Sequence, residues 1–259
     1  MHPAERLREL ETRARRRLGQ NFLVASGIAE MIVTRAGVRP GERVLEIGPG
    51  LGVLTEALQR AGATVVAIEL DRDLAAALPE VAPGVELIVD DAMRVPLPAV
   101  DRVVANLPYN VASPLCLRLL DLGVPMALMF QREVADRIEA EPGSRTYGSL
   151  SVQIQVRAAV SRLVSLAPGC FHPVPKVHSA VVGFEPRRIE FDARHFDRVV
   201  RLGFSARRKT LHNTFTAALG RDGARDFLLA CDVDPGARAE TVPLPAWHRL
   251  AAAFPIDSR

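Results

Sequence analysis

A glycine-rich turn and three acidic side chains are spaced along the chain in a way that suits the binding of a small ligand. Gly48 and Gly50 follow one apolar run. Glu69 closes the next such run, and Asp91 follows the third. Glycine lets a backbone turn tightly and lets a ligand approach it closely. An acid after the second strand can accept both hydroxyls of a ribose, and one after the third can accept from an adenine amino group. The pattern predicts an adenosine pocket.

The spacing of the glycines and the acidic residue beside them indicate which adenosine-containing ligand the pocket would bind. The turn reads G-x-G-x-G, from Gly48 to Gly52, whereas the dinucleotide fingerprint places its third glycine one residue later. Glu46 precedes the turn, where its charge repels a diphosphate and attracts a cation. We therefore expect S-adenosylmethionine (SAM), a sulfonium, as the cofactor. A NAD-dependent oxidoreductase is the disfavoured alternative.

A fourth apolar run ends in Asn106-Leu107-Pro108-Tyr109, and these side chains suit methyl transfer to a base amine. The lone pair of an exocyclic amine is delocalised into the ring, so the amine needs acceptors that orient its two N–H groups. Asn106 Oδ1 and a carbonyl beside Pro108 can accept from them, and Tyr109 offers a stacking face. The same tetrapeptide can be an ordinary turn. Its place at a strand end after Asp91 favours a catalytic site.

The elements that must position these residues alternate between strand and helix, which predicts an α/β fold with a mostly parallel sheet and helices on both faces. After Pro186 the apolar spacing becomes helical, so we expect a catalytic domain over 1–186, including a basic segment at 1–20, and a small helical domain over 187–259. The expected strands are 43–47, 63–70, 84–91, 101–106, 124–130, 149–160 and 179–186, and the expected helices lie at 26–36, near 52–61, from 71, from 113, and at 131–140.

Composition narrows the classes of protein. The chain of 259 residues carries a net charge of +3, but residues 1–20 and 187–259 are basic and the middle is acidic, which suits a polyanionic partner. No apolar run reaches the roughly 18 residues that span a bilayer, so no membrane association is expected. Cys116, Cys170 and Cys231 form neither a disulfide framework nor a zinc pattern, as expected of free thiols in a reducing cytoplasm, and no metal site is predicted.

With these motifs in place, the chain resembles the KsgA family of ribosomal RNA adenine N6,N6-dimethyltransferases. Members of this family use SAM to dimethylate two adjacent adenosines near the 3′ end of small-subunit rRNA during ribosome biogenesis. The resemblance covers nearly the full length. Its blocks are RLGQNFL (17–23), EIGPGLGVLTEAL (46–58), IELDRDLA (68–75), DDAM (90–93), NLPYNVASP (106–114), QREVADRI (131–138), YGSLSV (147–152), FHPVPKVHSAVV (171–182) and FSARRKTLHN (204–213).

The resemblance implies a Rossmann-like SAM-dependent methyltransferase fold with seven strands, and it implies residue roles. Asn106, Pro108 and Tyr109 would hold the target adenine, with Phe171 closing over its other face. The implied cofactor site comprises Gln20, Asn21, Phe22, Leu23, Glu46, Gly48, Gly50, Glu69, Leu70, Asp91, Ala92, Met93 and Asn106. The expected partner is the rRNA of an immature small ribosomal subunit, bound by a monomeric protein in the cytoplasm.

Basic side chains in three places are expected to contact RNA phosphates. The N-terminal segment, a proline-rich loop and the start of a C-terminal helix contribute Arg15, Arg16, Arg17, Lys176, Arg207, Arg208 and Lys209. Two alternatives stay open. One is the group of large-subunit rRNA adenine methyltransferases that confers macrolide resistance, which usually reads N-I-P-[FY] where this chain has Leu107. The other is a non-catalytic RNA-binding assembly factor, against which the intact acids and Asn106 argue.

Overall fold

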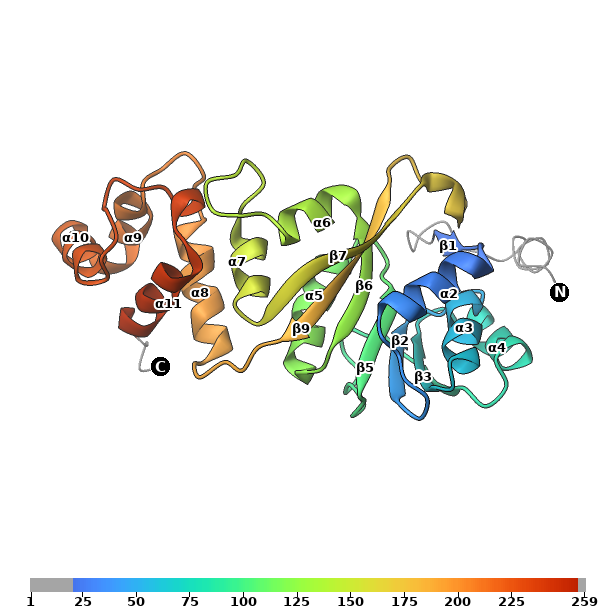
Figure 1. Cartoon of the computed structure of the whole chain (residues 1–259). Coiled ribbons are helices and arrows are strands. Elements are labelled where there is room, and N and C mark those ends of the chain that lie inside the picture. Colours follow the sequence, from blue (N-terminus) through green and yellow to red (C-terminus); the bar gives the residue numbers. More distant parts are fainter. Residues whose placement is uncertain (1–20, 256–259) are drawn as a thin grey trace. The chain divides into compact units, whose positions relative to one another are not determined.

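The computed structural model describes residues 21–255, which form two compact units (Figure 1). The first unit comprises residues up to Ala135 together with Val160–Pro186, and the second comprises Asp136–Ala159 and the residues from Arg187 onward. Gln20, Arg15, Arg16 and Arg17 lie outside the described residues, so their expected roles stay predictions.

The first unit is built on a seven-stranded sheet with the strand order β4-β3-β2-β5-β6-β9-β7. Neighbouring strands from β4 to β6 are parallel, and β9 runs antiparallel to β6. This mostly parallel sheet confirms the predicted fold class. The strands are β2 (Arg43–Ile47), β3 (Thr64–Glu69), β4 (Glu86–Val89), β5 (Arg102–Asn106), β6 (Met126–Gln131), β7 (Ala158–Leu166) and β9 (Ser179–Pro186).

The strand order reverses at β2, which fixes where a ligand can bind. The chain runs from β2 to β3 on one side and returns to β5 on the other, so Val44 pairs with both Val65 and Arg102. In open α/β sheets, ligands bind beyond the carboxyl ends of the strands at such a reversal. The ends of β2, β3 and β5 carry the residues of the predicted site.

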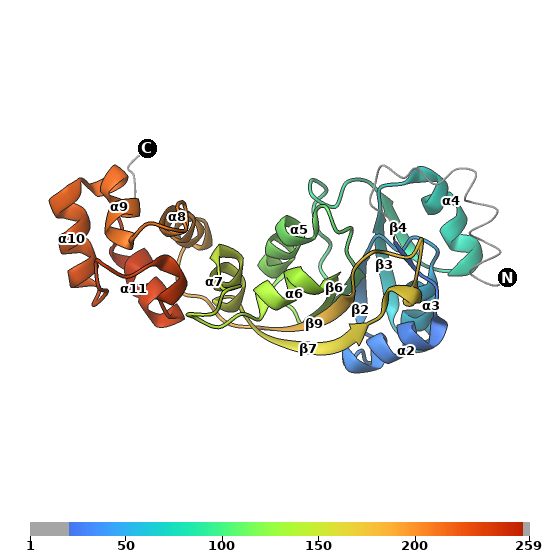
Figure 2. The same ribbon diagram turned by 90° about the horizontal axis from the view of Figure 1, so that it is seen from above.

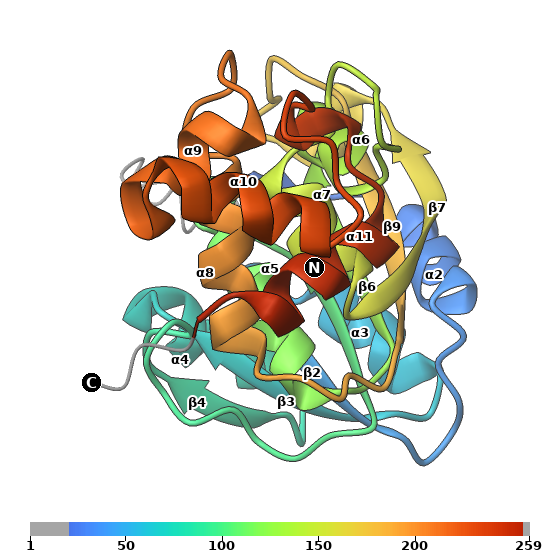
Figure 3. The same ribbon diagram turned by 90° about the vertical axis from the view of Figure 1, so that its left-hand side faces the viewer.

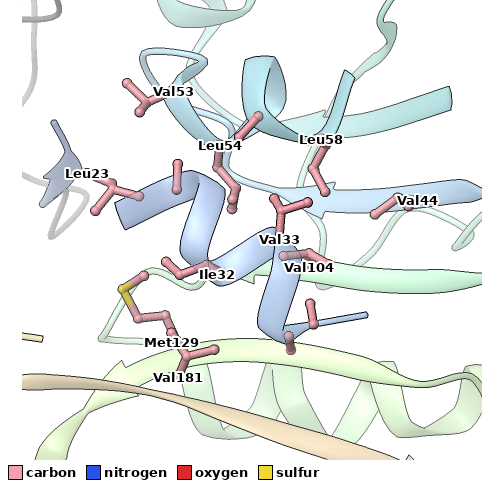
Figure 4. Close-up of a cluster of buried hydrophobic side chains, with 14 of the residues drawn as sticks. Leu23, Ile32, Val33, Val44, Val53, Leu54, Leu58, Val104, Met129 and Val181 are labelled. Carbon is pink, nitrogen blue, oxygen red and sulfur yellow. The ribbon is translucent and has the colours of Figure 1, made fainter. Parts of the chain in front are cut away.

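Helices cover both faces of this sheet. On one face, α2 (Ser26–Arg35) and α3 (Val53–Arg60) bury Val33, Leu54 and Leu58 against Val44 and Val104 of the strands (Figure 4). Figure 2 shows α5 (Ala112–Leu119) on the opposite side of the sheet. Burial of this apolar surface is the main force that holds the layers together.

Shorter elements complete the unit. Asp71 caps α4 (Arg72–Val81) by accepting hydrogen bonds from the N–H groups of Asp73 and Leu74. A two-stranded antiparallel sheet, not expected from the sequence, pairs β1 (Phe22–Leu23) with β8 (Phe171–His172). Two 3₁₀ turns lie at Leu120–Leu122 and Pro168–Cys170. The helix α6 (Arg132–Ile138) follows β6, and its residues from Asp136 onward belong to the second unit.

The second unit is helical (Figure 3). Its core is rich in aromatic side chains, including the fully buried Trp247, Phe196 and Phe215. Phe204 stacks on Trp247 with ring centroids 5.3 Å apart. The elements are α7 (Ser149–Gln155), α8 (Ala193–Gly203), α9 (Leu211–Leu219), α10 (Arg221–Ala230), α11 (Leu244–Ala253) and a 3₁₀ turn at Ala239–Thr241.

The predicted strand over 149–160 is wrong for most of its length, because Ser149–Gln155 is helix α7 and β7 begins only at Ala158. The alternation of Leu150, Val152 and Ile154 is typical of a half-buried strand. In the structure the side chains from Leu150 to Ile154 are all buried, so the alternation does not mark two faces. Ser151 Oγ accepts from the Gly148 N–H, which supports the helix start.

The division of the chain also differs from the predicted boundary in the segment 136–159. This segment belongs with the residues after Pro186 because it shares their core and their polar contacts. Arg157 forms a 2.9 Å ion pair with Asp197 of α8, and Tyr147 Oη donates to the carbonyl of Val242 at 3.1 Å. The helical unit is therefore built from two separate stretches of sequence.

Gly203 is the position in the second unit where a single methyl group has the clearest steric consequence. A Cβ there would lie 2.4 Å from Cη2 of the buried Trp247 ring. We expect Gly203→Ala to lower the free energy of unfolding of this unit by about 1–3 kcal/mol, as overpacked cores do. Urea unfolding followed by fluorescence of Trp247, the single tryptophan of the sequence, measures it.

Gly223→Ala on the exposed surface of α10 is the matched control. The nearest neighbour of its added Cβ would be Leu219 Cβ at 3.6 Å, an ordinary contact. Because alanine favours helix over glycine, this variant should be stabilised by roughly 0.5–1 kcal/mol. Equal midpoints for the two variants would contradict the steric argument.

Candidate active site

The glycine-rich turn runs between β2 and α3, and its shape depends on the absence of side chains. Gly50 has a φ of +55°, in the left-handed region that disfavours L side chains. A Cβ at Gly50 would also lie 2.8 Å from Cδ1 of Phe22. The turn therefore serves two purposes, because it exposes backbone to a ligand and seats the Phe22 ring of β1.

Glu69 ends β3 and ties the glycine turn to the next helix. Its Oε2 accepts from the Gly50 N–H at 3.2 Å, and its Oε1 accepts from the Asp71 N–H at 2.9 Å. Burial raises the pKa of Glu69, and these backbone donors act against that shift. Each carboxylate oxygen can still accept a second hydrogen bond, which is what recognition of two ribose hydroxyls needs.

Glu46 is the more deeply buried acid, with 1% of its surface exposed. Its Oε2 accepts a 2.7 Å hydrogen bond from Thr55 Oγ1 of α3. Burial raises the pKa of Glu46 to about 8; the Thr55 hydroxyl opposes this shift and the nearby Glu69 adds to it. The sequence argument treated Glu46 as ionised, whereas in this environment it is mostly protonated at neutral pH.

Asn106 ends β5 with one side of its amide already engaged. Its Nδ2 donates to the backbone carbonyl of Asn21 at 3.0 Å, which joins two segments far apart in the sequence. Because Nδ2 is held in this way, the orientation of the amide is fixed and Oδ1 is presented as the acceptor. An acceptor at this strand end is what the sequence argument required.

Pro108 and Tyr109 form a turn directly after β5. The Val111 N–H donates to the carbonyl of Pro108 at 3.1 Å and closes the turn. Tyr109 is half-buried, and its Oη shares a 2.7 Å hydrogen bond with Ser179 Oγ. Burial raises the pKa of Tyr109, while the Ser179 hydroxyl acts to lower it, so the phenol is neutral at physiological pH.

Two small cavities lie among these residues and share part of their lining. One of about 50 Å³ is lined by Asn21, Phe22, Gly48, Gly50, Glu69, Asn106, Leu107, Pro108 and Tyr109. The other, of about 20 Å³, is lined by Phe22, Leu23, Glu46, Gly48, Pro49, Gly50, Leu51, Val53, Leu54 and Asn106. The structure thus brings together ten of the residues that sequence reasoning assigned to the site.

The lining also tests the predicted cofactor. Two acids and no Lys or Arg occur among the described residues that line the cavities. A diphosphate needs donors and cations, whereas a sulfonium nucleoside is favoured by acids and by carbonyl groups. The residues present fit SAM and do not fit a dinucleotide.

Four of the predicted cofactor residues are not among those that line the two cavities. Leu70 follows Glu69 and is 52% exposed. Asp91 Oδ1 accepts from the Met93 N–H at 2.8 Å, and Arg118 donates to the carbonyl of Ala92. The loop is joined to β3 because the Asp90 N–H donates to the carbonyl of Glu69 at 3.1 Å. Contact of Leu70, Asp91, Ala92 and Met93 with an adenine ring stays a prediction.

Phe171, expected to cover the target base, lies elsewhere in this structure. It pairs with Leu23 in the two-stranded sheet, is 1% exposed, and belongs to the main apolar core. It is absent from the lining of both cavities. Stacking of Phe171 on a base would require the β1–β8 pair to move, so that role stays a prediction.

The basic residues expected to bind RNA differ in their contacts within the protein. Lys176 is exposed, between the exposed Val174 and Val177. In the second unit, Arg208 and Lys209 are exposed in the turn before α9, which begins at Leu211.

Arg207 is already held within the second unit. Its Nη2 donates to the carbonyl of Arg145 at 2.5 Å, and its Nε lies 3.4 Å from a carboxylate oxygen of Glu240. A phosphate would have to compete with these contacts of Arg207, and phosphate binding by Arg207, Arg208 and Lys209 stays a prediction.

Sequence reasoning missed two hydroxyls of the site, Thr55 and Ser179. Thr55 lies on α3 at a spacing from Glu46 that only the strand–turn–helix geometry brings together. Ser179 follows the proline-rich loop and is separated from Tyr109 by 70 positions. Neither has a local sequence signal.

The structure places limits on other classes of site. Within residues 21–255, no group of three or more His, Cys, Asp or Glu side chains is arranged to hold a metal ion. Over the same residues, every helix is too short or too polar to cross a bilayer.

Comparison with known proteins agrees with this geometry. Residues 11–254 match the family model for ribosomal RNA adenine dimethylase. A ribosomal RNA small subunit methyltransferase A of Syntrophotalea carbinolica is 43% identical over 254 residues, which cover 92% of this chain and 96% of the relative. One of the same name from Acidithiobacillus ferrooxidans is 44% identical over 258 residues, covering 93% and 94%.

Solved structures show the same fold. A dimethyladenosine transferase from Plasmodium falciparum superposes with a TM-score of 0.76 at 26% identity, covering 86% of this chain and 94% of that one. The 23S rRNA methyltransferase ErmE gives a TM-score of 0.67 at 25% identity, covering 90% and 99%. From the family match along nearly its whole length, the chain belongs to the ribosomal RNA adenine dimethylase family.

Proposed function

We propose that this protein uses SAM to dimethylate N6 of two adjacent adenosines near the 3′ end of small-subunit rRNA. One observation carries the proposal: Asn106 presents an amide oxygen at the end of β5, beside a cavity lined by Glu69 and the glycine turn. An acceptor for an amine and a cradle for a phosphate-free adenosine thus share one cavity. The curated relatives named for the small subunit support the choice of rRNA.

The proposed cofactor site extends beyond the cavity lining. Its members are Gln20, Asn21, Phe22, Leu23, Glu46, Gly48, Gly50, Glu69, Leu70, Asp91, Ala92, Met93 and Asn106. SAM, when bound, supplies an electrophilic methyl group. Glu69 would hold the ribose, Asp91 the adenine amino group, and Glu46 the positive charge.

The residues after β5 would then do the work of positioning the acceptor. Asn106 Oδ1 and a carbonyl of the Leu107–Pro108 turn would each accept an N–H of the adenine amine. This pulls the nitrogen toward a tetrahedral geometry and frees its lone pair for in-line attack. Tyr109 would stack on the base, a contact worth roughly 1–3 kcal/mol. The proton lost by the amine after methyl transfer would pass to solvent, because amide and carbonyl oxygens accept hydrogen bonds but are too weakly basic to take a proton.

The likeness to a 23S rRNA methyltransferase supports a second candidate, methylation of large-subunit rRNA. The identity of 41–44% to curated small-subunit enzymes, against 25% to that structure, favours the first. As partner we propose an immature small subunit, bound by a monomeric enzyme in the cytoplasm. Incubation with unmethylated small and large subunits and labelled SAM, followed by mass spectrometric mapping, tests both. Product on large-subunit RNA alone would overturn the proposal.

Asn106→Ala should lower the single-turnover rate of methylation about 100- to 1000-fold, the cost of removing one preorganised partner of the reacting group. Cofactor affinity, measured by calorimetry, should change only a few-fold, because Glu69 and the glycine turn remain in place. Asn110→Ala, an exposed asparagine four residues away in the same turn, is the matched control and should stay fully active. Normal turnover of the Asn106 variant would refute its assigned role.

The raised pKa of Glu46 predicts how SAM binding depends on pH. Below about 8 the side chain is mostly protonated, and a cation favours its ionised form, so binding must release a proton. Affinity for SAM should therefore tighten as pH rises from 6 to 8, by up to about tenfold per unit. Calorimetry in buffers of different ionisation enthalpy measures the proton released.

Two comparisons isolate the cause of this pH dependence. Glu46→Gln should flatten the dependence. S-adenosylhomocysteine, whose sulfur is neutral, should bind the unaltered protein without it. Equal proton release for the two ligands would show that Glu46 does not sense the sulfonium.

Replacement of Arg208 and Lys209 with Gln should weaken binding to small-subunit rRNA. Because each phosphate contact contributes about 0.7–0.9 to the slope of log K against log salt, the slope should fall by roughly 1.4–1.8. The exposed Arg221 and Arg225 of α10 offer a charge-matched control pair. Equal slopes for the two double variants would mean that Arg208 and Lys209 face solvent in the complex.

A further inference from the structure

The hydrogen bond between Tyr109 and Ser179 joins parts of the sheet that are not neighbours. Tyr109 follows β5, Ser179 begins β9, and β6 lies between these two strands in the sheet. Their hydroxyl oxygens are 2.7 Å apart. The bond therefore spans the end of β6 and links the turn of the proposed active site to a separate strand.

Ser179 is a rigid anchor for such a bond. It is 1% exposed and pairs with Gln131 in the antiparallel β6–β9 ladder. The residue before it is held as well, because the Arg132 N–H donates to the carbonyl of His178 at 2.9 Å. A buried hydroxyl is costly to leave without a partner, so this one favours a fixed position of the phenol.

Tyr109, by contrast, is less enclosed than Ser179. It lies in a turn and is only half-buried, with one side on the cavity that Asn106 also lines. A tyrosine ring in such a place can rotate about two side-chain torsions. Stacking on a base needs the ring face at one defined angle. Because Oη lies on the axis of the second torsion, a hydrogen bond there fixes where the end of the ring lies. It also favours one ring face, because the phenol O–H prefers the plane of the ring.

We propose that Ser179 is a positioning residue for methyl transfer, which holds the Tyr109 ring at the angle at which it stacks on the target adenine. This inference rests on the proposed function, because it assumes that Tyr109 contacts a base. Ser179 acts only through Tyr109 and touches neither the base nor the cofactor. Its chemical contribution is one hydroxyl at a fixed distance from the phenol.

Loss of the hydroxyl should affect the reaction more than the fold. The bond is an ordinary neutral hydrogen bond, so we expect Ser179→Ala to lower the single-turnover rate at saturating RNA about 3- to 10-fold. SAM affinity should be unchanged, since Ser179 does not line the cofactor cavity. Tyr109→Phe, which keeps the ring and removes the same bond, should give a similar loss.

A double-mutant cycle separates positioning from packing. If Ser179 acts through Tyr109, the double variant should be no slower than either single variant, because the second change removes nothing more. Ser179→Cys keeps the volume but provides only a weak donor, and it should behave like Ser179→Ala. Ser179→Thr restores a hydroxyl and should recover most of the rate. Ser165→Ala, an exposed serine of β7, is the control.

A spectroscopic readout reports the stacking itself. RNA that carries 2-aminopurine at the mapped target position should lose less fluorescence on binding Ser179→Ala than on binding the unaltered protein, because the ring stacks on the base for less of the time. Multiplicative losses in the cycle, together with unchanged quenching, would overturn the inference. Failure of the unaltered protein to methylate small-subunit rRNA would instead overturn the proposed function.

Discussion

The Glu69 carboxylate accepts two backbone hydrogen bonds on which the rest of the site depends. By accepting from the Gly50 and Asp71 N–H groups, it fixes the turn after β2 and the entry to α4 at the same time. Parallel pairing of β2 and β3 brings these two segments together, but strands alone do not fix the loops that follow them. A buried acid with two backbone donors does, and it keeps acceptor capacity for a ligand.

The residues at the end of β5 and in the turn after it are held by hydrogen bonds to distant segments. Asn106 donates to the carbonyl of Asn21, and the hydroxyl groups of Tyr109 and Ser179 share a hydrogen bond. In both cases a residue at or just after the end of β5 is held by a segment far away in the sequence. In the proposed mechanism, the amide and the ring are thus oriented before any substrate arrives, which is the form of preorganisation that lowers a reaction barrier.

The sequence predicted those features that follow from local pattern. The strand–turn–helix around Gly48 and Gly50, and the acids at strand ends, were readable because topology places strand ends together. The helix at Ser149–Gln155 was not, because alternation of apolar residues fails as a signal where every face is buried.

Contacts between distant segments were equally hidden. The burial of Phe171 in the β1–β8 pair and the partnership of Ser179 with Tyr109 depend on long-range packing. The protonation of Glu46 has the same origin, since burial causes it and the sequence does not show burial.

Glu46, the buried acid before the glycine turn, would make the proposed site bind a cationic ligand more tightly than a neutral one. Before a ligand binds, burial favours the protonated form of Glu46, so this side chain adds little negative charge to the site. Binding of a sulfonium would favour ionisation of Glu46, which would then act as its counter-ion, whereas a thioether carries no charge for Glu46 to pair with. Glu46 would therefore favour the sulfonium over the thioether that remains after methyl transfer. Dimethylation of two bases would consume four molecules of SAM. Weak binding of the spent cofactor would therefore favour completion of all four methyl transfers.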